Sequence, residues 1–374
     1  MARDIASTFI FLVLHVLLSS FFPCMCYSRV IEKHGGEIKG MFVFGSSLVD
    51  NGNNNFLQNL AKADYLPYGI DFPYGPSGRF TNGKNVIDLI GEKLKLPLIP
   101  AFADPSTKGS KIVHGVNYAS GASGILDDTG LIAGHVMSLN KQIRNFEEVT
   151  LPELGAQMGY NGTRELVGNY LFVVGSGGND YSFNYFLRQT NYNNVSLQVF
   201  TANLTNSLSS KLKKLYRLGG RKFVLMAVNP IGCSPVVVAS RPTRNGCNQG
   251  LNLAAHLFNA HLRSLVGVIK QQMPGSSLVF VNSYKIIRDI IRNPVPRGFK
   301  DTSNPCCEVP SLSEGGNGIL CRKGGQACED RNLHVFFDGL HPTEAVNVQI
   351  ANKAYNSNLQ NEVYPISIKQ LADL

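Results

Sequence analysis

Two side chains near the end of the chain have the types and spacing needed to move a proton. Asp338 and His341 stand three residues apart in the stretch FFDGLHPTEA, directly before a predicted helix. A lone Asp-x-x-His is also compatible with a capped turn and an ordinary loop histidine. If a serine hydroxyl lies beside the imidazole, however, the histidine can take its proton while the carboxylate orients the ring and stabilises its charged form. The serine must then come from elsewhere in the chain.

The stretch MFVFGSSLVDNGNNN offers this serine. Residues 41–44 form an apolar run that predicts a buried strand, and Gly45 ends it with dihedral freedom that other residues lack. If a helix follows, Ser46 and Ser47 lie on a strand-to-helix turn at the carboxyl edge of a sheet, where open α/β folds bind ligands. Helix capping is the alternative role, because serine is a favoured N-cap residue. The stretch is not the G-x-S-x-G elbow of α/β-hydrolases, since Val49 stands where that motif has glycine.

Two glycine-rich segments could stabilise the oxyanion that acyl transfer creates. Apolar runs at 112–119 and 170–174 predict strands that end in SGASG and in GSGGND, which contains Asn179. A backbone N–H of a glycine turn and an asparagine amide are suitable donors when they are fixed in advance. Asn-Asp after glycine also forms simple turns, so neither segment is specific alone. These strands and the one before Ser47 could place all three segments at one sheet edge.

Strands and helices alternate along the rest of the chain. The patterns predict further strands at 223–228 and 277–281, and helices at 86–94, 138–149, 197–215, 254–269 and from Thr343, the last with Ala345, Val348, Ala351 and Tyr355 on one face. Such alternation predicts an α/β fold with a mostly parallel sheet and helices on both faces. We find no linker and expect a single domain at 27–374. The segments 51–110 and 293–333 are loop-rich instead.

The first residues predict export. An apolar run at 10–22 follows Arg3, and it is too short to span a bilayer and too near the terminus to belong to a core. It is typical of a signal peptide at residues 1–26, with cleavage after about Cys26. No later run is long enough for a transmembrane helix, and the C-terminus is not a KDEL-type signal. We therefore expect a secreted, extracellular protein without stable membrane insertion.

The cysteines that remain after cleavage form an even set: Cys233, Cys247, Cys306, Cys307, Cys321 and Cys328. An oxidising compartment makes disulfide bonds the first interpretation, although their pairing cannot be derived from the sequence. Zinc is the competing interpretation, but this set contains no C-x-x-C pair and thiolates would not stay reduced outside the cell. We expect no metal. Asn161, Asn194 and Asn203 head N-x-S/T sequons, which become candidate glycosylation sites in an exported chain.

The formal net charge of +9 raises nucleic acid as a partner. The basic residues are scattered, however, and the densest group is Lys211, Lys213, Lys214 and Arg217. This group lies in an amphipathic helical pattern, where a solvated helix face explains it. Export also argues against a nucleic-acid partner.

Four motifs in a fixed order resemble one family. FGSSLVDNGNNN, GVNYASGASGIL, GSGGNDY and FFDGLHPTEA are similar to the blocks of the plant GDSL esterase/lipases, members of the SGNH hydrolase superfamily. The likeness extends over essentially the whole mature chain and includes RFTNGKNVIDLI, NPIGCSP and the late cysteine cluster. It implies a flavodoxin-like three-layer α/β/α sandwich. It also implies a serine hydrolase that cleaves a small-molecule or lipid carboxylic ester through an acyl-serine intermediate, without a cofactor or metal.

The resemblance also implies a catalytic triad. Ser47 would be the nucleophile, His341 the general base and acid, and Asp338 the carboxylate that orients the histidine. Because the histidine must be neutral to act as a base, activity should fall toward acid pH. Oligomeric state and the natural ester are left open.

The same resemblance implies the donors of an oxyanion hole. They would be the backbone N–H of Ser47, the side-chain amide of Asn179 and the backbone N–H of a glycine in the second block. Gly124 is the favoured glycine, and Gly121 is the alternative.

One position departs from the family pattern. The first block of the family reads Gly-Asp-Ser-Leu, whereas this chain has Gly45-Ser46-Ser47-Leu48. The missing aspartate is not the triad carboxylate, but a charged acceptor beside the nucleophile is lost. We expect a slower yet competent hydrolase. The alternative, from another class, is a secreted scaffold that only binds an ester, lipid or wall ligand, and retention of the four other proposed side chains favours the enzyme.

Overall fold

The computed structural model describes residues 37–159, 163–187, 194–240 and 246–374. Its main sheet has six strands in the order β2-β1-β3-β4-β5-β8. Neighbouring strands are parallel except for the pair β5 and β8. The strands are β1 Gly40–Gly45, β2 Gly115–Asn117, β3 Tyr170–Gly175, β4 Lys222–Met226, β5 Ser277–Val281 and β8 Val363–Tyr364. The prediction of a mostly parallel sheet is confirmed.

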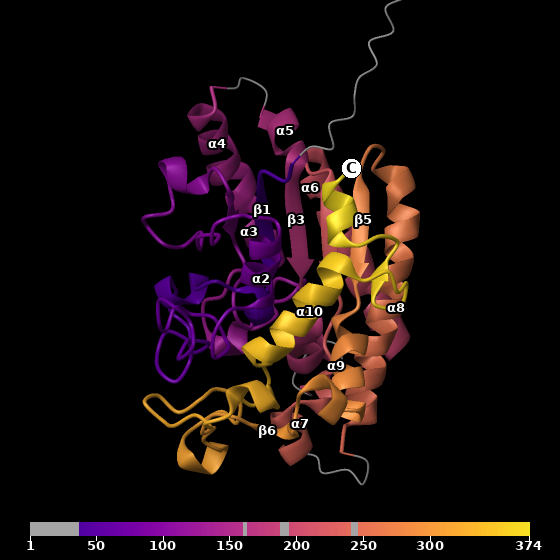
Figure 1. The fold of residues 1–374 in the computed structure, drawn as a ribbon. Coiled ribbons are helices and arrows are strands. Elements are labelled where there is room, and N and C mark those ends of the chain that lie inside the picture. The colour runs from indigo at the N-terminus through magenta and orange to yellow at the C-terminus, as the bar shows by residue number, and fades with distance from the viewer. Residues whose placement is uncertain (1–36, 160–162, 188–193, 241–245) are drawn as a thin grey trace, which may run out of the picture. The chain divides into compact units, whose positions relative to one another are not determined.

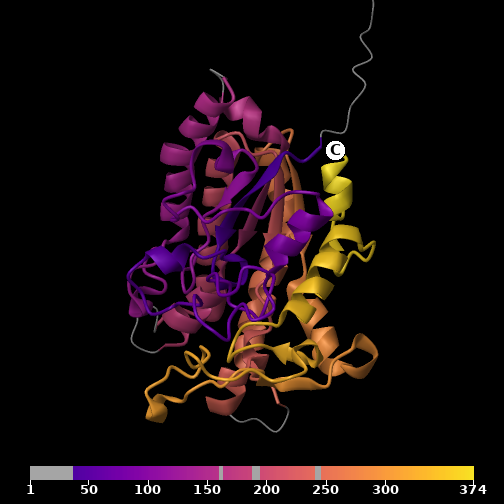
Figure 2. The same ribbon diagram turned by 60° about the vertical axis from the view of Figure 1, so that its left-hand side comes forward.

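Helices cover both faces of this sheet (Figures 1 and 2). They are α2 Val86–Lys93, α3 Leu139–Asn145, α4 Leu151–Gln157, α5 Thr163–Leu166, α6 Leu197–Arg217, α7 Pro235–Ser240, α8 Gln249–Gln272, α9 Ser283–Arg292, α10 Glu344–Asn356 and α11 Ile368–Ala372. Phe42 and Phe44 of β1 pack in one core with α3, α6 and α8, and Met41 and Val43 pack in the other with α2, α9 and α10. Because successive strand side chains point to opposite faces, one apolar strand supplies both cores of the three-layer α/β/α sandwich.

Some elements differ from the predictions in extent or in buried face. The strand predicted at 112–119 is only β2, because Gly109–Ile112 forms a 3-10 helix. The helix predicted at 138–149 is α3, which continues through a π-helical turn at Phe146–Thr150 into α4. Of the predicted face of α10, Ala351 is buried and Ala345 and Tyr355 pack partly buried against the core, but Val348 is exposed. The other buried residues of this helix are Val346, Asn347, Ile350 and Ala354. This helix packs against α2, α9 and α11, so its buried surface is wider than one stripe.

Lys211 contradicts the prediction of a fully solvated basic face on α6. It is buried, with Nζ 2.8 Å from Ser207 Oγ, and burial lowers its pKa. Lys213 and Lys214 are half-buried and Arg217 is exposed. A long lysine stem can cover apolar surface, so charge type alone did not reveal the buried position.

The cysteine-rich segment is held by a small sheet and by disulfides. Strands β6 Asp301–Pro305 and β7 His334–Phe336 pair in parallel. The six cysteines form Cys233–Cys247, Cys306–Cys328 and Cys307–Cys321. The last two bridges share an apolar cluster with Tyr68, Phe80 and Phe337. The predicted disulfide set is therefore present, with a pairing that the sequence left open.

Candidate active site

Ser47 follows β1, whose last residue, Gly45, is paired with Gly175 at the end of β3. Gly45 has φ +151°, and a Cβ there would lie 2.3 Å from the carbonyl oxygen of Gly175, so this approach requires glycine. The N–H of Ser46 donates to the same carbonyl at 3.1 Å. Ser47 then begins a single 3-10 turn, and the Ser46 side chain does not cap it. Capping therefore does not account for this pair of serines.

The structure brings Ser47, His341 and Asp338 into one series of contacts. Ser47 Oγ lies 2.8 Å from His341 Nε2, and His341 Nδ1 lies 2.8 and 3.0 Å from the two carboxylate oxygens of Asp338. Because a carboxylate only accepts, Nδ1 carries the proton, and Nε2 of the neutral ring can accept from the serine hydroxyl. All three residues are buried. The arrangement can therefore transfer a proton from Ser47 to His341.

The turn before α10 fixes the histidine. Asp338 Oδ1 accepts from the backbone N–H groups of Leu340 at 2.8 Å and His341 at 2.7 Å, so the carboxylate closes its own turn. The His341 carbonyl accepts from the N–H of Phe337 at 2.8 Å. The Phe80 ring packs on the imidazole with centroids 4.9 Å apart. These contacts hold both the backbone and the ring of His341.

Tyr68 is a neighbour of Asp338 that no sequence motif indicated. Its hydroxyl donates to Asp338 Oδ2 at 2.6 Å. It lies in the Gly- and Pro-rich loop before α2, where the sequence carries no periodic signal. The only available hint was that long irregular loops in compact domains are commonly functional.

Asn179 faces the same pocket as Ser47. It follows β3, and its side-chain amide donates one hydrogen bond to the Ser123 carbonyl at 2.9 Å. An amide has two N–H groups, so a second donor is available for a ligand. The structure thus brings the first, third and fourth sequence motifs together.

The two second-block glycines are placed differently. The N–H of Gly121 donates to Asp50 Oδ2 at 2.9 Å. The N–H of Gly124 has no acceptor within the described ranges. Neither glycine is among the described residues that line the pocket, and Gly124 packs against the Asp180 carboxylate.

Two fully buried carboxylates hold the second-block loop, and the sequence did not reveal either. Asp180 accepts from Ile125 N at 3.0 Å, Leu126 N at 2.9 Å and Thr129 Oγ1 at 2.8 Å. Asp50 accepts from Gly121 on the other side of the loop. Desolvation raises the pKa of both groups from 3.8 to about 6, although these hydrogen bonds act in the opposite direction.

A pocket of about 980 Å³, part of it open to solvent, lies beside Ser47 and His341. Its described lining is mainly apolar and includes Val49, Met226, Val228, Ile231, Ile287 and Ile350. His341 is the only ionisable side chain among the described lining residues. The pocket therefore suits a neutral, apolar group.

In the part of the chain that the structure describes, one group of possible metal ligands occurs, and it lies outside this pocket. Cys306 Sγ, Cys328 Sγ and a ring nitrogen of His334 lie within 4.8 Å of one another. The two sulfur atoms are bonded to each other, so they offer no thiolate to a metal.

Comparison with known proteins gives one consistent family. The model of the family GDSL-like Lipase/Acylhydrolase matches residues 41–354. GDSL esterase/lipase At1g29670 of Arabidopsis thaliana is 39% identical over 94% of this chain and 96% of its own length, and At5g08460 of the same species is 43% identical over 89% and 87%.

Among solved structures, a catalytic mutant of the acetylxylan esterase Axe2 from Geobacillus stearothermophilus is similar over 85% of this chain and 92% of that chain, with 13% identity and a TM-score of 0.40. That likeness is too distant to carry an argument about substrate. The family match and the Arabidopsis relatives show that this chain belongs to the GDSL esterase/lipase family and is a carboxylic ester hydrolase that uses a serine.

Proposed function

We propose that this protein cleaves carboxylic esters through an acyl-serine intermediate on Ser47, outside the cell. The observation that carries the proposal is the series of contacts from Ser47 Oγ to His341 Nε2, at 2.8 Å, and from His341 Nδ1 to Asp338, at 2.8 Å. This is the order of groups that an activated serine nucleophile requires. It lies at the edge of an apolar pocket that can receive the acyl part of an ester.

In the first half of the reaction, Ser47 Oγ attacks the ester carbonyl carbon while its proton moves to His341 Nε2. The carbonyl π pair becomes an oxyanion, and the ring becomes an imidazolium that Asp338 stabilises. When the tetrahedral intermediate collapses, the bond from carbon to the alcohol oxygen breaks. The leaving alkoxide takes the proton from His341, and the acyl group remains on Ser47.

The second half repeats these steps with water. His341 Nε2 takes a proton from water as the water oxygen attacks the acyl carbon. Collapse breaks the bond to Ser47 Oγ, which recovers the proton from His341. The products are a carboxylic acid and an alcohol, and the residues return to their starting state without a cofactor.

The oxyanion needs donors that are already in place. Ser47 N–H and the Asn179 amide are proposed for this role because both residues line the pocket. The proposed third donor comes from the second-block loop. Gly124 is preferred over Gly121 there, because the Gly121 N–H already donates to Asp50.

Turnover of p-nitrophenyl esters by the purified protein tests this proposal. The wild type should hydrolyse them and react with a fluorophosphonate at Ser47, whereas a folded Ser47→Ala variant should do neither. Exposed Ser313 provides a matched control, because Ser313→Ala removes a serine hydroxyl outside the four motifs. Equal turnover by the wild type and Ser47→Ala would rule out this nucleophile.

Export is the second part of the proposal. The apolar run at 10–22 and the sequon at Asn161 lie outside the described residues, whereas Asn194 and Asn203 are exposed. Three disulfides support an oxidising compartment. Within the described part of the chain, no helix has the length and apolar character to cross a bilayer. Secretion from a eukaryotic host should yield a chain that begins near residue 27 and loses mass on deglycosylation; retention inside the host would contradict this part.

A further inference from the structure

We propose that Tyr68 is a positioning residue for Asp338 and that the Cys307–Cys321 bridge holds Tyr68 in place. The inference rests on the proposed function, because Tyr68 would act on catalysis through Asp338 and His341. It extends the active site to two regions without a catalytic motif: the loop before α2 and the cysteine-rich segment 306–328.

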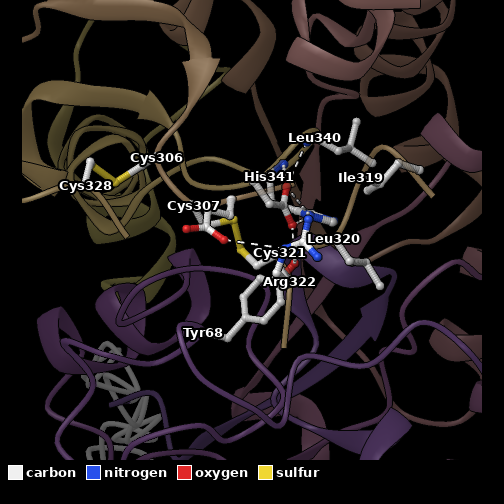
Figure 3. The surroundings of a disulfide bond; sticks show 12 residues. Tyr68, Cys306, Cys307, Ile319, Leu320, Cys321, Arg322, Cys328, Leu340 and His341 are labelled. Carbon is white, nitrogen blue, oxygen red and sulfur yellow. Dashed lines mark hydrogen bonds and ion pairs between the residues drawn. A yellow bond between two sulfur atoms is a disulfide. The ribbon is translucent and has the colours of Figure 1, made fainter. Parts of the chain in front are cut away.

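Tyr68 connects the disulfide to the carboxylate. Its hydroxyl donates to Asp338 Oδ2 at 2.6 Å and accepts from the backbone N–H of Cys321 at 3.1 Å. The bonded partner, Cys307, donates its own N–H to the carbonyl of Phe337 at 2.9 Å. Phe337 directly precedes Asp338, so the bridge contacts both Tyr68 and the backbone that carries the carboxylate. Figure 3 shows Tyr68 and Cys321 in this setting, with His341 in the same view.

The surroundings of Tyr68 leave its hydroxyl in one position. The side chain is fully buried, and its ring packs edge-on against Tyr65, Phe80 and Phe337 with centroids 5.4, 6.1 and 5.7 Å apart. Burial and the negative charge of Asp338 raise the pKa of Tyr68 well above its ordinary value of 10. The phenol is therefore a neutral donor throughout the pH range of catalysis.

This donor shares one carboxylate oxygen of Asp338 with the imidazole. Asp338 Oδ2 accepts from Tyr68 and from His341 Nδ1, which lies 2.8 Å away. Without the phenol, Oδ2 accepts from the imidazole alone while Oδ1 keeps its backbone donors, so Oδ2 is held less firmly and more of its negative charge acts on the ring. The ring should then be less well oriented and should hold its proton more strongly.

Tyr68→Phe removes one oxygen atom and keeps the ring, so it tests the hydrogen bond alone. Tyr65→Phe is the matched control: Tyr65 belongs to the same cluster and donates to the carbonyl of Cys321 at 2.9 Å, but the structure gives it no hydrogen bond to Asp338. The charged groups beside Cys321, Arg322 with Glu308 and Glu314, are unchanged in both variants.

For Tyr68→Phe we expect kcat to fall by about tenfold with KM nearly unchanged. In the pH profile of kcat, the fall in activity on the acid side should move to higher pH by about 0.5 to 1 unit. Tyr65→Phe should have the same acid side of the pH profile as the wild type and a kcat within about twofold of the wild-type value. A merely structural role for Tyr68 would lower thermal stability and leave the acid side of the pH profile in place, and that result would overturn the inference.

An NMR titration of ¹⁵N-histidine-labelled protein reports the protonation of His341 without turnover. We expect the midpoint for His341 to move upward in Tyr68→Phe and not in Tyr65→Phe, and unmoved midpoints in both variants would overturn the inference. If the wild type neither turns over nor labels at Ser47, the proposed function fails, while this titration still decides the role of Tyr68.

Discussion

Ser46 lies beside the proposed nucleophile and lines the pocket, at the position where the resemblance to the family implies an aspartate. Ser46 follows β1, and Ser176 follows β3 at the same level of the parallel register. Both residues line the pocket, and Ser176 Oγ is buried without a hydrogen-bond partner among the described residues. A carboxylate at position 46 would give this hydroxyl an acceptor and place a negative charge near the imidazolium that forms during catalysis.

Ser46→Asp should therefore raise kcat for a p-nitrophenyl ester by about three- to tenfold, the effect of one charge-assisted hydrogen bond. The measurement is steady-state kinetics of the single variant and of Ser46→Asp combined with Ser176→Ala. The double variant should lose most of the gain. A folded Ser46→Asp protein that is slower than the wild type would show that the serine suits this site better.

A second residue-scale prediction concerns stability and pH. Burial raises the pKa of Asp180 from 3.8 to about 6. Because the folded-state value is the higher one, the protonated carboxyl stabilises the fold below about pH 4, and this contribution is lost as the pH rises through about 6. The shift corresponds to about 3 kcal/mol.

Asp180→Asn should therefore flatten the dependence of unfolding free energy on pH between about pH 4 and 6, even though its amide supports the loop less well. Urea unfolding at several pH values measures this slope. Asp330→Asn, at an exposed position, is the control with the same charge change. Parallel curves for the wild type and Asp180→Asn would mean that Asp180 has an ordinary titration in the folded protein.

At the scale of elements, the sequence predicted the type and order of the helices and strands better than it predicted where each one begins and ends. The runs that became β1, β3, β4 and β5 were predicted because parallel strands covered on both faces are apolar throughout. The buried face of α10 was predicted only in part, because three neighbouring helices contact this helix and its buried surface is wider than a single stripe of apolar residues. The burial of Lys211 was not predicted for a related reason, because burial depends on the neighbouring element and not only on the type of residue.

The turn at 120–123 holds an alanine in a conformation that favours glycine. Ser123 N–H donates to the Ser120 carbonyl at 3.1 Å, and Ala122 has φ +66°. A left-handed conformation costs a non-glycine residue about 1–2 kcal/mol, and glycine avoids this cost. The greater conformational freedom of glycine in the unfolded chain offsets part of the stability that is gained. Ala122→Gly should therefore increase the free energy of unfolding by about 0.5–1 kcal/mol.

Denaturant unfolding of Ala122→Gly checks this prediction. Ala133→Gly is the matched control, because Ala133 lies in a 3-10 turn without a positive φ and should lose stability on the same substitution. If both variants lose stability equally, the conformation of residue 122 is not strained in solution.

At the scale of the whole molecule, covalent links supplement the two cores. The three bridges join residues 14, 22 and 14 positions apart. Loops of this length are worth about 3 kcal/mol each in the chain-entropy description. Reduced protein should unfold at a clearly lower urea concentration than oxidised protein and should lose ester hydrolysis first, because the Cys307–Cys321 bridge lies next to Asp338 through Tyr68. Coincident unfolding curves would show that the bridges do not stabilise the fold.

The sequence by itself determined the α/β class, the order of most elements and the candidate groups Ser47, Asn179, Asp338 and His341. These features are local, since a strand period, a glycine turn or an Asp-x-x-His spacing can be recognised within a few residues. Only the tertiary structure decided that the hydroxyl and the imidazole meet, because those residues are 294 positions apart. The cysteine pairing and the contact of Tyr68 with Asp338 were decided in the same way, by packing between distant segments that no local pattern encodes.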